Sequence, residues 1–282
     1  GGSVRMGKSF APPLYGWDNE FGEHEADVDP FRASRHLVSN AEFLEFVEDG
    51  GYASDDLWTE EGRGWKSYQQ AAHPRFWIPD SGSYRLRTTW EEIDMPWDWP
   101  VEVNYLEAKA FCNWRKERQG RPVRLPTEEE WMLLRDRHVD TDQPWWDRAP
   151  GNINLEHYAG SCPVTEFRFG DFYDVIGNVW QWTETPITGF RNFRPHPYYD
   201  DFSTPTFDSL HNLIKGGSWI STGNEATRDS RYAFRRHFYQ HAGLRTVESE
   251  RPPRVFVDFY ETDEQICQYC EFHYGEEFFG VP

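Results

Sequence analysis

Three features are scarce in this sequence, and each scarcity narrows what the chain can be. Lysine and arginine total 29 against 48 aspartates and glutamates, a formal net charge of -19, which disfavours binding to phosphate backbones. We therefore expect no nucleic-acid partner. No apolar run approaches the roughly 20 residues that a membrane helix needs, and the N-terminal stretch has no signal-peptide core. These absences predict no membrane segment and a cytoplasmic location.

Cysteine is the third scarce feature. The four cysteines are Cys112, Cys162, Cys267 and Cys270. They are too few and too scattered for a disulfide framework in a chain of 282 residues. Cys267 and Cys270 have the CxxC spacing of many metal sites, but no second pair accompanies them. We interpret these two as ordinary thiols on an amphipathic helix near the C-terminus.

Aromatic residues, by contrast, are abundant. They make up 17% of the chain, while the mean hydropathy is only -0.83. The stretch "GNVWQWTETP" (177–186) even places Trp180 and Trp182 two positions apart. The core must therefore be built from large rings whose polar edges need hydrogen-bond partners. Such a core favours an irregular, loop-rich fold over a helix bundle.

Apolar spacing and capping residues predict helices at 39–52, 104–120 and 124–137. The first has Ser39 or Asn40 as its N-cap and two glycines at its end. The second ends at Gly120. In the third, Thr127 is the N-cap and Glu130 occupies the position that completes a capping box.

The rest of the chain predicts one compact domain with a tail. Residues 139–216 favour short strands and long loops, the usual carriers of binding groups. No repeat or low-complexity linker divides residues 1–249. Residues 250–282 are expected to form a linker and a helical tail that begins near Glu261. Both ends look cut, so we expect the chain to be a piece of a longer polypeptide.

Four stretches, in order, resemble the formylglycine-generating-enzyme superfamily. They are "RPVRLPTEEEW" (121–131), "GNVWQWT" (177–183), "KGGSWIS" (215–221) and "RYAFRRHFYQHAGLR" (231–245). The resemblance covers roughly residues 1–249, and four ordered motifs make it specific at the superfamily level. It implies an α+β fold of the irregular C-type-lectin-like kind, rich in loops, with few short helices and strands.

Further stretches look like one branch of that superfamily. They are "YGWDNEFGEH" (15–24), "TPITGF" (185–190), "HPYYDDFSTPTFD" (196–208) and the segment 211–245. The branch is the iron-dependent 5-histidylcysteine sulfoxide synthases of ovothiol biosynthesis, relatives of the ergothioneine sulfoxide synthases. The resemblance implies an oxidoreductase that uses O2 to join the sulfur of cysteine to the imidazole of histidine.

The same resemblance implies a cofactor and a partner domain. Fe(II) is held in these enzymes by three histidines of an N-terminal helical domain, on which the domain seen here packs. This chain has neither that helical domain nor the methyltransferase domain that usually follows. We therefore expect its iron ligands to lie elsewhere and the isolated fragment to be inactive.

Two rival functions follow from the same residues. Formylglycine generation uses a pair of cysteines after the Gly-Gly-Ser stretch to hold copper, and this chain has no cysteine between Cys162 and Cys267, which disfavours that activity. The second rival is a non-catalytic binding module that has kept the lectin-like fold. An upstream helical domain with the three-histidine pattern would distinguish a synthase from such a module.

Tyr199 is the candidate catalytic residue. It aligns with the tyrosine that, in ergothioneine synthases, donates a hydrogen bond or a proton during oxygen chemistry at the iron. That role needs a hydroxyl held near an oxygen on which charge develops. Tyr198 is adjacent, so a shift of one residue in the alignment would exchange the two. A packing role is the alternative for a tyrosine in such a loop.

The predicted substrate contacts form a charged cluster. They are Arg228, Asp229, Arg231 and Arg235. The family binds cysteine in the matching region through an acid and an arginine, and a guanidinium suits a carboxylate because it can donate two parallel hydrogen bonds. Arg231 is the favoured member. The alternative is an ion-pair network in the core.

The superfamily also wraps a structural calcium in the loop around its Gly-Asn-x-Trp motif. The matching positions are Asp174, Gly177, Val179 and Gln181. They offer the side-chain and main-chain oxygens that a hard cation prefers, although Gln181 stands where the family usually has a glutamate and so removes a charge. Trp180 and Trp182 are interpreted mainly as core residues that fix this loop.

His237 and His241 are the most tempting metal ligands by spacing alone. They stand four residues apart in "HFYQH", which would place two imidazoles on one helical face. However, Gly243 ends the segment and no carboxylate follows at the family's position. We therefore expect them to bind no metal.

Overall fold

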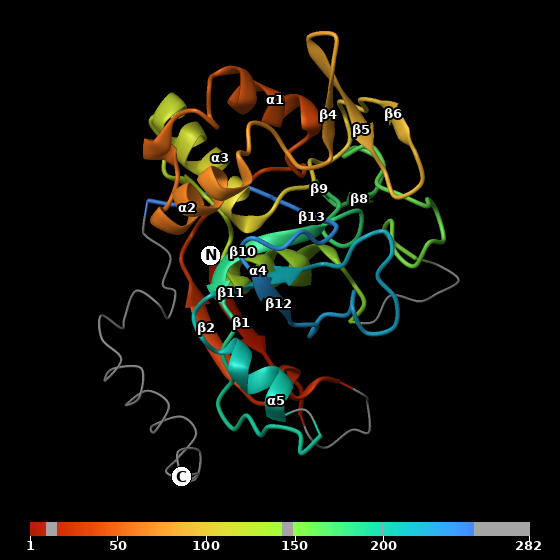
Figure 1. Cartoon of the computed structure of the whole chain (residues 1–282). Coiled ribbons are helices and arrows are strands. Elements are labelled where there is room, and N and C mark those ends of the chain that lie inside the picture. The colour runs from red at the N-terminus through yellow and green to blue at the C-terminus, as the bar shows by residue number, and fades with distance from the viewer. Residues whose placement is uncertain (10–15, 143–148, 199, 251–282) are drawn as a thin grey trace.

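The computed structural model describes residues 1–9, 16–142, 149–198 and 200–250 (Figure 1). The α-helices are α1 (Asn40–Glu48), α2 (Glu60–Gln69), α3 (Tyr105–Gln119), α4 (Glu128–His138) and the short α5 (Asp200–Ser203). Turns of 3-10 helix lie at Asp18–Glu20, Asp55–Leu57 and Thr204–Thr206. The predicted tail, with Cys267 and Cys270, lies outside the described residues.

The predicted N-caps of α1 and α4 and the predicted end of α3 are confirmed, but α1 ends at Glu48 rather than 52, and Val123–Arg124 form strand β7 rather than the start of α4. In α1 the side chain of Ser39 accepts a hydrogen bond from the backbone of Glu42, which completes a capping box. The same arrangement joins Thr127 to Glu130 at the start of α4. Helix α3 ends at Gly120, whose φ of 62° is the left-handed conformation that glycine adopts without strain.

Helix α2 is not predicted by the sequence, because Gly62 and Gly64 fall inside it. Each glycine in a helix interior costs about 1 kcal/mol relative to alanine. Tertiary packing overrides this cost. The Trp65 ring stacks on Trp58 with 6.0 Å between centroids. A Cβ at position 62 would lie 3.1 Å from the Trp58 ring, so the glycine lets that ring approach the helix closely.

A four-stranded sheet organises the chain around strand β10 (Trp180–Pro186). Its order is β12–β11–β10–β13, with β11 (His211–Lys215), β12 (Tyr232–Arg235) and β13 (Ala242–Gly243). Strand β10 pairs antiparallel with β11 and parallel with β13. All seven residues of β10 are buried, so this motif strand forms the centre of the fold.

Short sheets surround this one. The N-terminal pair is β1 (Gly2–Met6) and β2 (His24–Val28). The three-stranded sheets are β3 (Arg32–Ala33), β14 (Val247–Glu248) and β7 (Val123–Arg124), and β4 (Trp77–Asp80), β5 (Ser83–Arg87) and β6 (Glu92–Asp94). A last pair is β8 (Arg168–Phe169) and β9 (Phe172–Tyr173). Mixed short elements joined by long loops confirm the predicted α+β class.

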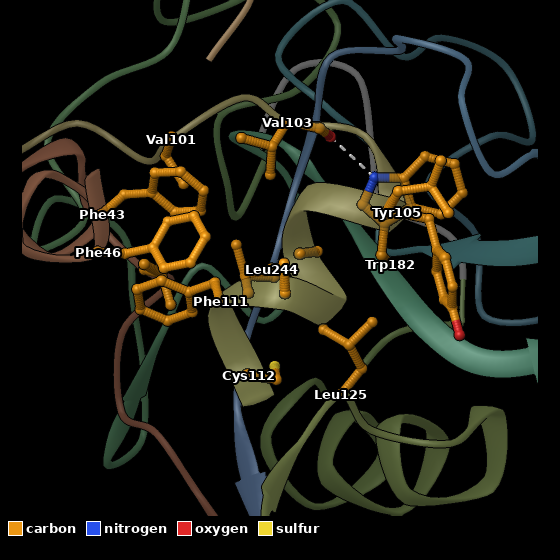
Figure 2. Packing of buried hydrophobic residues seen from close by; sticks show 14 of the residues in the cluster. Phe43, Phe46, Val101, Val103, Tyr105, Phe111, Cys112, Leu125, Trp182 and Leu244 are labelled. Carbon is orange, nitrogen blue, oxygen red and sulfur yellow. Dashed lines mark hydrogen bonds between the residues drawn. The ribbon is translucent and has the colours of Figure 1, made fainter. Parts of the chain in front are cut away.

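Aromatic rings dominate the core, as the composition predicts. Phe43 stacks on Phe111 with 5.1 Å between ring centroids. Trp182 is fully buried, and its Nε1 donates a hydrogen bond to the carbonyl of Val103 at 2.9 Å (Figure 2). Tyr105 packs edge-on against the same indole. The interpretation of Trp180 and Trp182 as core residues is confirmed.

In space, most of the helices lie toward one end of the molecule or the other. Helices α1, α2 and α3 gather at one end, and α5 lies at the other, below the tip of the β1–β2 ribbon (Figure 1). Helix α4 lies between, in contact with both β1–β2 and β10–β11. Over the described part of the chain, the helices are too short or too polar to cross a membrane.

Candidate functional site

Tyr199, the candidate catalytic residue, lies outside the described residues, so its role stays a prediction. Its surroundings are described on both sides. Tyr198 is 84% exposed and Phe202 is 61% exposed. The two rings on either side of position 199 are therefore exposed to solvent.

Asp18 holds this segment on both sides of position 199. Its Oδ2 accepts a hydrogen bond from the backbone N–H of His196 at 3.0 Å, and its Oδ1 accepts one from the hydroxyl of Ser203. Asp18 and Ser203 are both buried. Because a buried carboxylate needs such partners, these bonds fix the segment to the turn at Asp18–Glu20.

Trp17, next to Asp18, connects the same turn to the central sheet. Its Nε1 donates a hydrogen bond to the Tyr232 hydroxyl of β12 at 2.9 Å. The Tyr232 ring in turn lies 5.6 Å from that of Trp180 in β10. On its other side Trp17 lies 6.1 Å from the Phe202 ring. The segment around position 199 is thus anchored, through Trp17 and Asp18, to the most buried part of the fold.

Sequence reasoning missed Asp18 and Trp17 as site residues. Both belong to "YGWDNEFGEH", a stretch that carries the family resemblance, and that was the available signal. Their partners are far away in the chain: 178 residues separate Asp18 from His196, and 215 separate Trp17 from Tyr232. Spacing along a single sequence does not reveal such pairs.

Arg231, the favoured substrate contact, is buried and already paired. Its Nε and Nη2 donate to the two carboxylate oxygens of Glu128 at 2.9 and 3.0 Å. Its Nη1 donates to the backbone carbonyls of Asn19 and Thr188. This is the core ion pair that the sequence left open as the alternative. Direct contact between Arg231 and a substrate carboxylate stays a prediction, and it would require this pair to open.

Lys215 joins the same ion pair. Its Nζ lies 3.2 Å from Glu128 Oε1, and both side chains are buried. Burial raises the pKa of Glu128, but the charges of Arg231 and Lys215 outweigh burial and lower it to about 2. Glu128 is therefore ionised at any physiological pH, and one carboxylate holds two cations in the core.

The other three predicted substrate-binding residues pair with residues other than Arg231. Arg228 donates two hydrogen bonds to the carboxylate of Asp136, at 2.9 and 2.7 Å, and one to Asp229. Arg235 is exposed on β12, with 3.6 Å between its Nη2 and Asp208. The structure thus places Arg228 and Asp229 in one ion-pair cluster and Arg231 and Arg235 in two others. Their shared role in substrate binding stays a prediction.

The predicted calcium loop is organised around Arg245. The Nε of this buried arginine donates to the amide oxygen of Gln181 at 3.0 Å. Its Nη2 donates to the carbonyls of Tyr173 and Asp174. As placed, the Gln181 oxygen faces a fixed positive charge and does not fit a cation. Calcium at Asp174, Gly177, Val179 and Gln181 therefore stays a prediction.

Asp174 is the one acid in this loop. It is buried, and its Oδ2 accepts a hydrogen bond from Asn178 at 3.2 Å, while its Oδ1 has no partner among the described residues. Burial raises the pKa of Asp174 to about 7, although Asn178 and the charge of Arg245 lower it. The side chain can thus hold a proton near neutral pH.

His237 and His241 do not lie together as metal ligands. Among the residues that the structure describes, no three His, Cys, Asp or Glu side chains form a possible metal site. His237 is exposed. His241 instead pairs with Glu102, with 2.9 Å between Nδ1 and Oε2. Burial lowers the pKa of His241, but the hydrogen bond to Glu102 and the charge of Glu102 together outweigh burial and raise it overall.

Comparison with known proteins assigns this chain to a family. Residues 1–250 match the sulfatase-modifying factor enzyme 1-like domain. The chain is 32% identical over 232 residues to a hercynine oxygenase of Mycolicibacterium thermoresistibile, covering 76% of this chain and 49% of that protein. It is 28% identical to ergothioneine biosynthesis protein 1 of Schizosaccharomyces pombe, covering 80% of this chain and 26% of that protein.

A solved structure shows the same fold. PvdO from Pseudomonas aeruginosa superposes with a TM-score of 0.60 at 14% identity, over 88% of this chain and 91% of that one. The chain belongs to the family of sulfatase-modifying factor enzyme 1-like domains, the superfamily of the formylglycine-generating enzymes, and its relatives include proteins of ergothioneine biosynthesis. It spans about half the length of the hercynine oxygenase that it matches.

Proposed function

We propose that this chain is the substrate-binding and catalytic-tyrosine part of a non-haem iron, O2-dependent sulfoxide synthase. The proposed substrates are cysteine and histidine, as in ovothiol biosynthesis. The similarity to a hercynine oxygenase carries the proposal, because it extends over 232 residues at 32% identity and covers 76% of this chain. The match to about half of that relative supports a division of labour with another domain.

The proposed reaction is balanced without a further reductant. One S–H bond of cysteine and one C–H bond of the imidazole are broken, and a C–S bond forms. One oxygen atom of O2 ends on the sulfur, and the other leaves as water with the two hydrogens. Bound Fe(II) would supply the oxygen chemistry, and the protein would supply binding and orientation. No described residues fit iron, so we assign its ligands to an N-terminal helical domain.

The residues of this chain would hold and orient the substrates. We propose that Tyr199 provides a hydroxyl that donates a hydrogen bond or a proton at the reacting oxygen. Asp18 supports this role because it fixes the segment on both sides of position 199. The exposed rings of Tyr198 and Phe202 suit a face that the helical domain covers.

The test is a reconstitution of the full-length protein that carries this chain. Fe(II) is added without oxygen, then O2 with cysteine and histidine, and products are analysed by mass. We expect a product that joins both amino acids and contains one added oxygen. Tyr199→Phe should lower the yield of this product or change the product ratio. Tyr198→Phe is the matched control, and it should behave like the wild type.

Two results would contradict the proposal in different ways. Iron binding without a coupled product would show that the proposed donor or acceptor is wrong. Absence of iron binding would favour the rival function, a non-catalytic lectin-like binding module. If instead Tyr198→Phe gave the altered product, the catalytic role would move by one residue and the synthase assignment would stand.

A further inference from the structure

We propose that a cavity beside His241 and Glu102 binds a small carboxylic acid with an apolar body. The cavity has a volume of about 120 Å3. It lies between the β4–β5 hairpin, the segment that precedes α3, and residues 159–161. Its lining includes none of the residues that hold the segment around position 199, such as Trp17, Asp18 and Ser203. This inference therefore does not depend on the proposed synthase function.

Four aromatic rings contribute to the wall. The rings are those of Phe76, Trp77, Trp99 and Trp219, with Leu86 beside them. Trp77 and Trp219 are fully buried at 2% exposure, so they are fixed parts of the core rather than mobile surface groups. Rigid apolar walls with few polar groups are the usual composition of a small-molecule site.

His241 is the polar group in the cavity wall that would orient a bound ligand. Its Nδ1 is held by Glu102 at 2.9 Å, and its ring lies 4.7 Å from that of Trp219. A partner on Nδ1 fixes the orientation of an imidazole and leaves Nε2 as the atom that can meet a ligand. No described residue forms a hydrogen bond to this Nε2. The side chain remains 35% exposed, so it can be reached.

His241 is the group in the cavity to which an anion can bind. The charged residues that line it are Arg87, Glu102 and His241. Both carboxylate oxygens of Glu102 already accept hydrogen bonds, one from Ser161 at 3.1 Å and one from His241. Arg87 is already paired, with 3.5 Å between its Nη2 and Glu92 Oε1, so a protonated His241 is the cation that a ligand in the cavity would meet. A ligand carboxylate at His241 Nε2 would complete the pairing through a charge-assisted hydrogen bond.

The volume limits the size of the ligand. An engineered apolar cavity of about 150 Å3 accepts benzene, so about 120 Å3 admits a whole molecule of some four to six heavy atoms. Isobutyrate has this size, with a branched apolar body and one carboxylate. Isobutyramide has nearly the same shape and no charge. The two compounds therefore form a matched pair of probes.

The experiment is an NMR titration of the histidine ring protons of the whole chain with each probe. His241→Gln assigns the His241 signal among the ten histidines. We expect isobutyrate to shift this signal in a saturable way and to raise the pH at which it titrates, because a bound anion stabilises the imidazolium. Isobutyramide should bind about tenfold more weakly or worse.

Variants distinguish binding of isobutyrate at this site from non-specific binding elsewhere. His241→Gln should abolish the effect of isobutyrate on nearby tryptophan signals, whereas His237→Gln, at the exposed histidine of the same segment, should leave it unchanged. If His241→Gln does not fold, Glu102→Gln serves instead and should weaken isobutyrate binding several-fold, because His241 then loses the carboxylate that holds it. Equal binding of the two probes, or no shift of His241 with either, would overturn the proposal.

Discussion

Glu128 and Arg231 form a doubly hydrogen-bonded ion pair inside the core, although 103 residues separate them in the sequence. Glu128 begins α4, and Arg231 immediately precedes β12. The pair therefore links the capped end of a helix to the edge of the central sheet. Lys215 of β11 binds the same carboxylate, so three elements meet at one buried charge.

Glu128→Gln should destabilise the chain strongly. Removing one partner of a buried pair leaves the other charge uncompensated, which costs about 3 to 5 kcal/mol, and here two cations lose their carboxylate. Urea unfolding followed by tryptophan fluorescence measures the change. Glu45→Gln is the control, because the Glu45–Arg118 pair is exposed and should contribute under about 1 kcal/mol. Equal losses in both variants would contradict this account.

Stability should fall as the pH rises toward 7, because two buried carboxyl groups prefer to be protonated. Burial raises the pKa of Glu107 to about 7, although hydrogen bonds from Tyr52 and Asn104 lower it. Asp174 behaves likewise. A raised pKa in the folded state contributes stability that is complete below the unfolded value of about 4.5 and is lost as the pH passes 7.

Glu107→Gln should therefore make the free energy of unfolding less dependent on pH between about 4.5 and 7. The amide can still accept the bond that the Tyr52 hydroxyl donates at 2.6 Å. Asp174→Asn should reduce the slope in the same way, and the double variant should have a smaller slope than either single variant. A slope that is unchanged in Glu107→Gln would show that its carboxyl titrates at an ordinary pKa.

The helix boundaries could be predicted because each signal is local. Ser39, Thr127 and Gly120 act on backbone groups within a turn of themselves, so a short stretch of sequence contains the whole interaction. Helix α2 could not be predicted for the opposite reason. Its glycines disfavour a helix locally, and the packing of Trp65 on Trp58 becomes visible only in three dimensions.

The site was less predictable than the fold. Family resemblance selected the candidate segments, but it did not show that Arg231 donates its hydrogen bonds to Glu128 or that Arg245 occupies the predicted calcium loop. Charged residues of the same type look alike in a sequence whether they bind a ligand or another part of the chain. Only the positions of their partners distinguish these roles.

Arg245→Lys should destabilise the chain by about 2 to 4 kcal/mol, because an ammonium cannot reproduce the fork that donates to Gln181, Ser34 and Tyr173. Thermal unfolding with and without millimolar calcium is the measurement. The wild type should respond little, since a guanidinium already faces the Gln181 oxygen. Recovery of the variant by calcium would show that the cation can replace the arginine at the predicted loop.

Asp18→Asn should loosen the segment around position 199 without unfolding the chain. The neutral amide can still accept from the His196 N–H and donate to the Ser203 hydroxyl, but both bonds lose the charge that strengthens them, at a cost of about 1 to 2 kcal/mol. Hydrogen exchange by mass spectrometry should show roughly tenfold or faster exchange in peptides that cover 196–203, since 1.4 kcal/mol corresponds to a factor of ten.

Asp27→Asn, at an exposed position of the nearby strand β2, is the control and should leave this exchange unchanged. In the full-length protein the two variants also separate a positioning role from a structural one. If Asp18 positions Tyr199, then Asp18→Asn should change the product ratio in the same direction as Tyr199→Phe, at unchanged iron binding. If exchange accelerates while the product ratio stays at the wild-type value, Asp18 only stabilises the segment, and catalysis does not depend on where that segment is held.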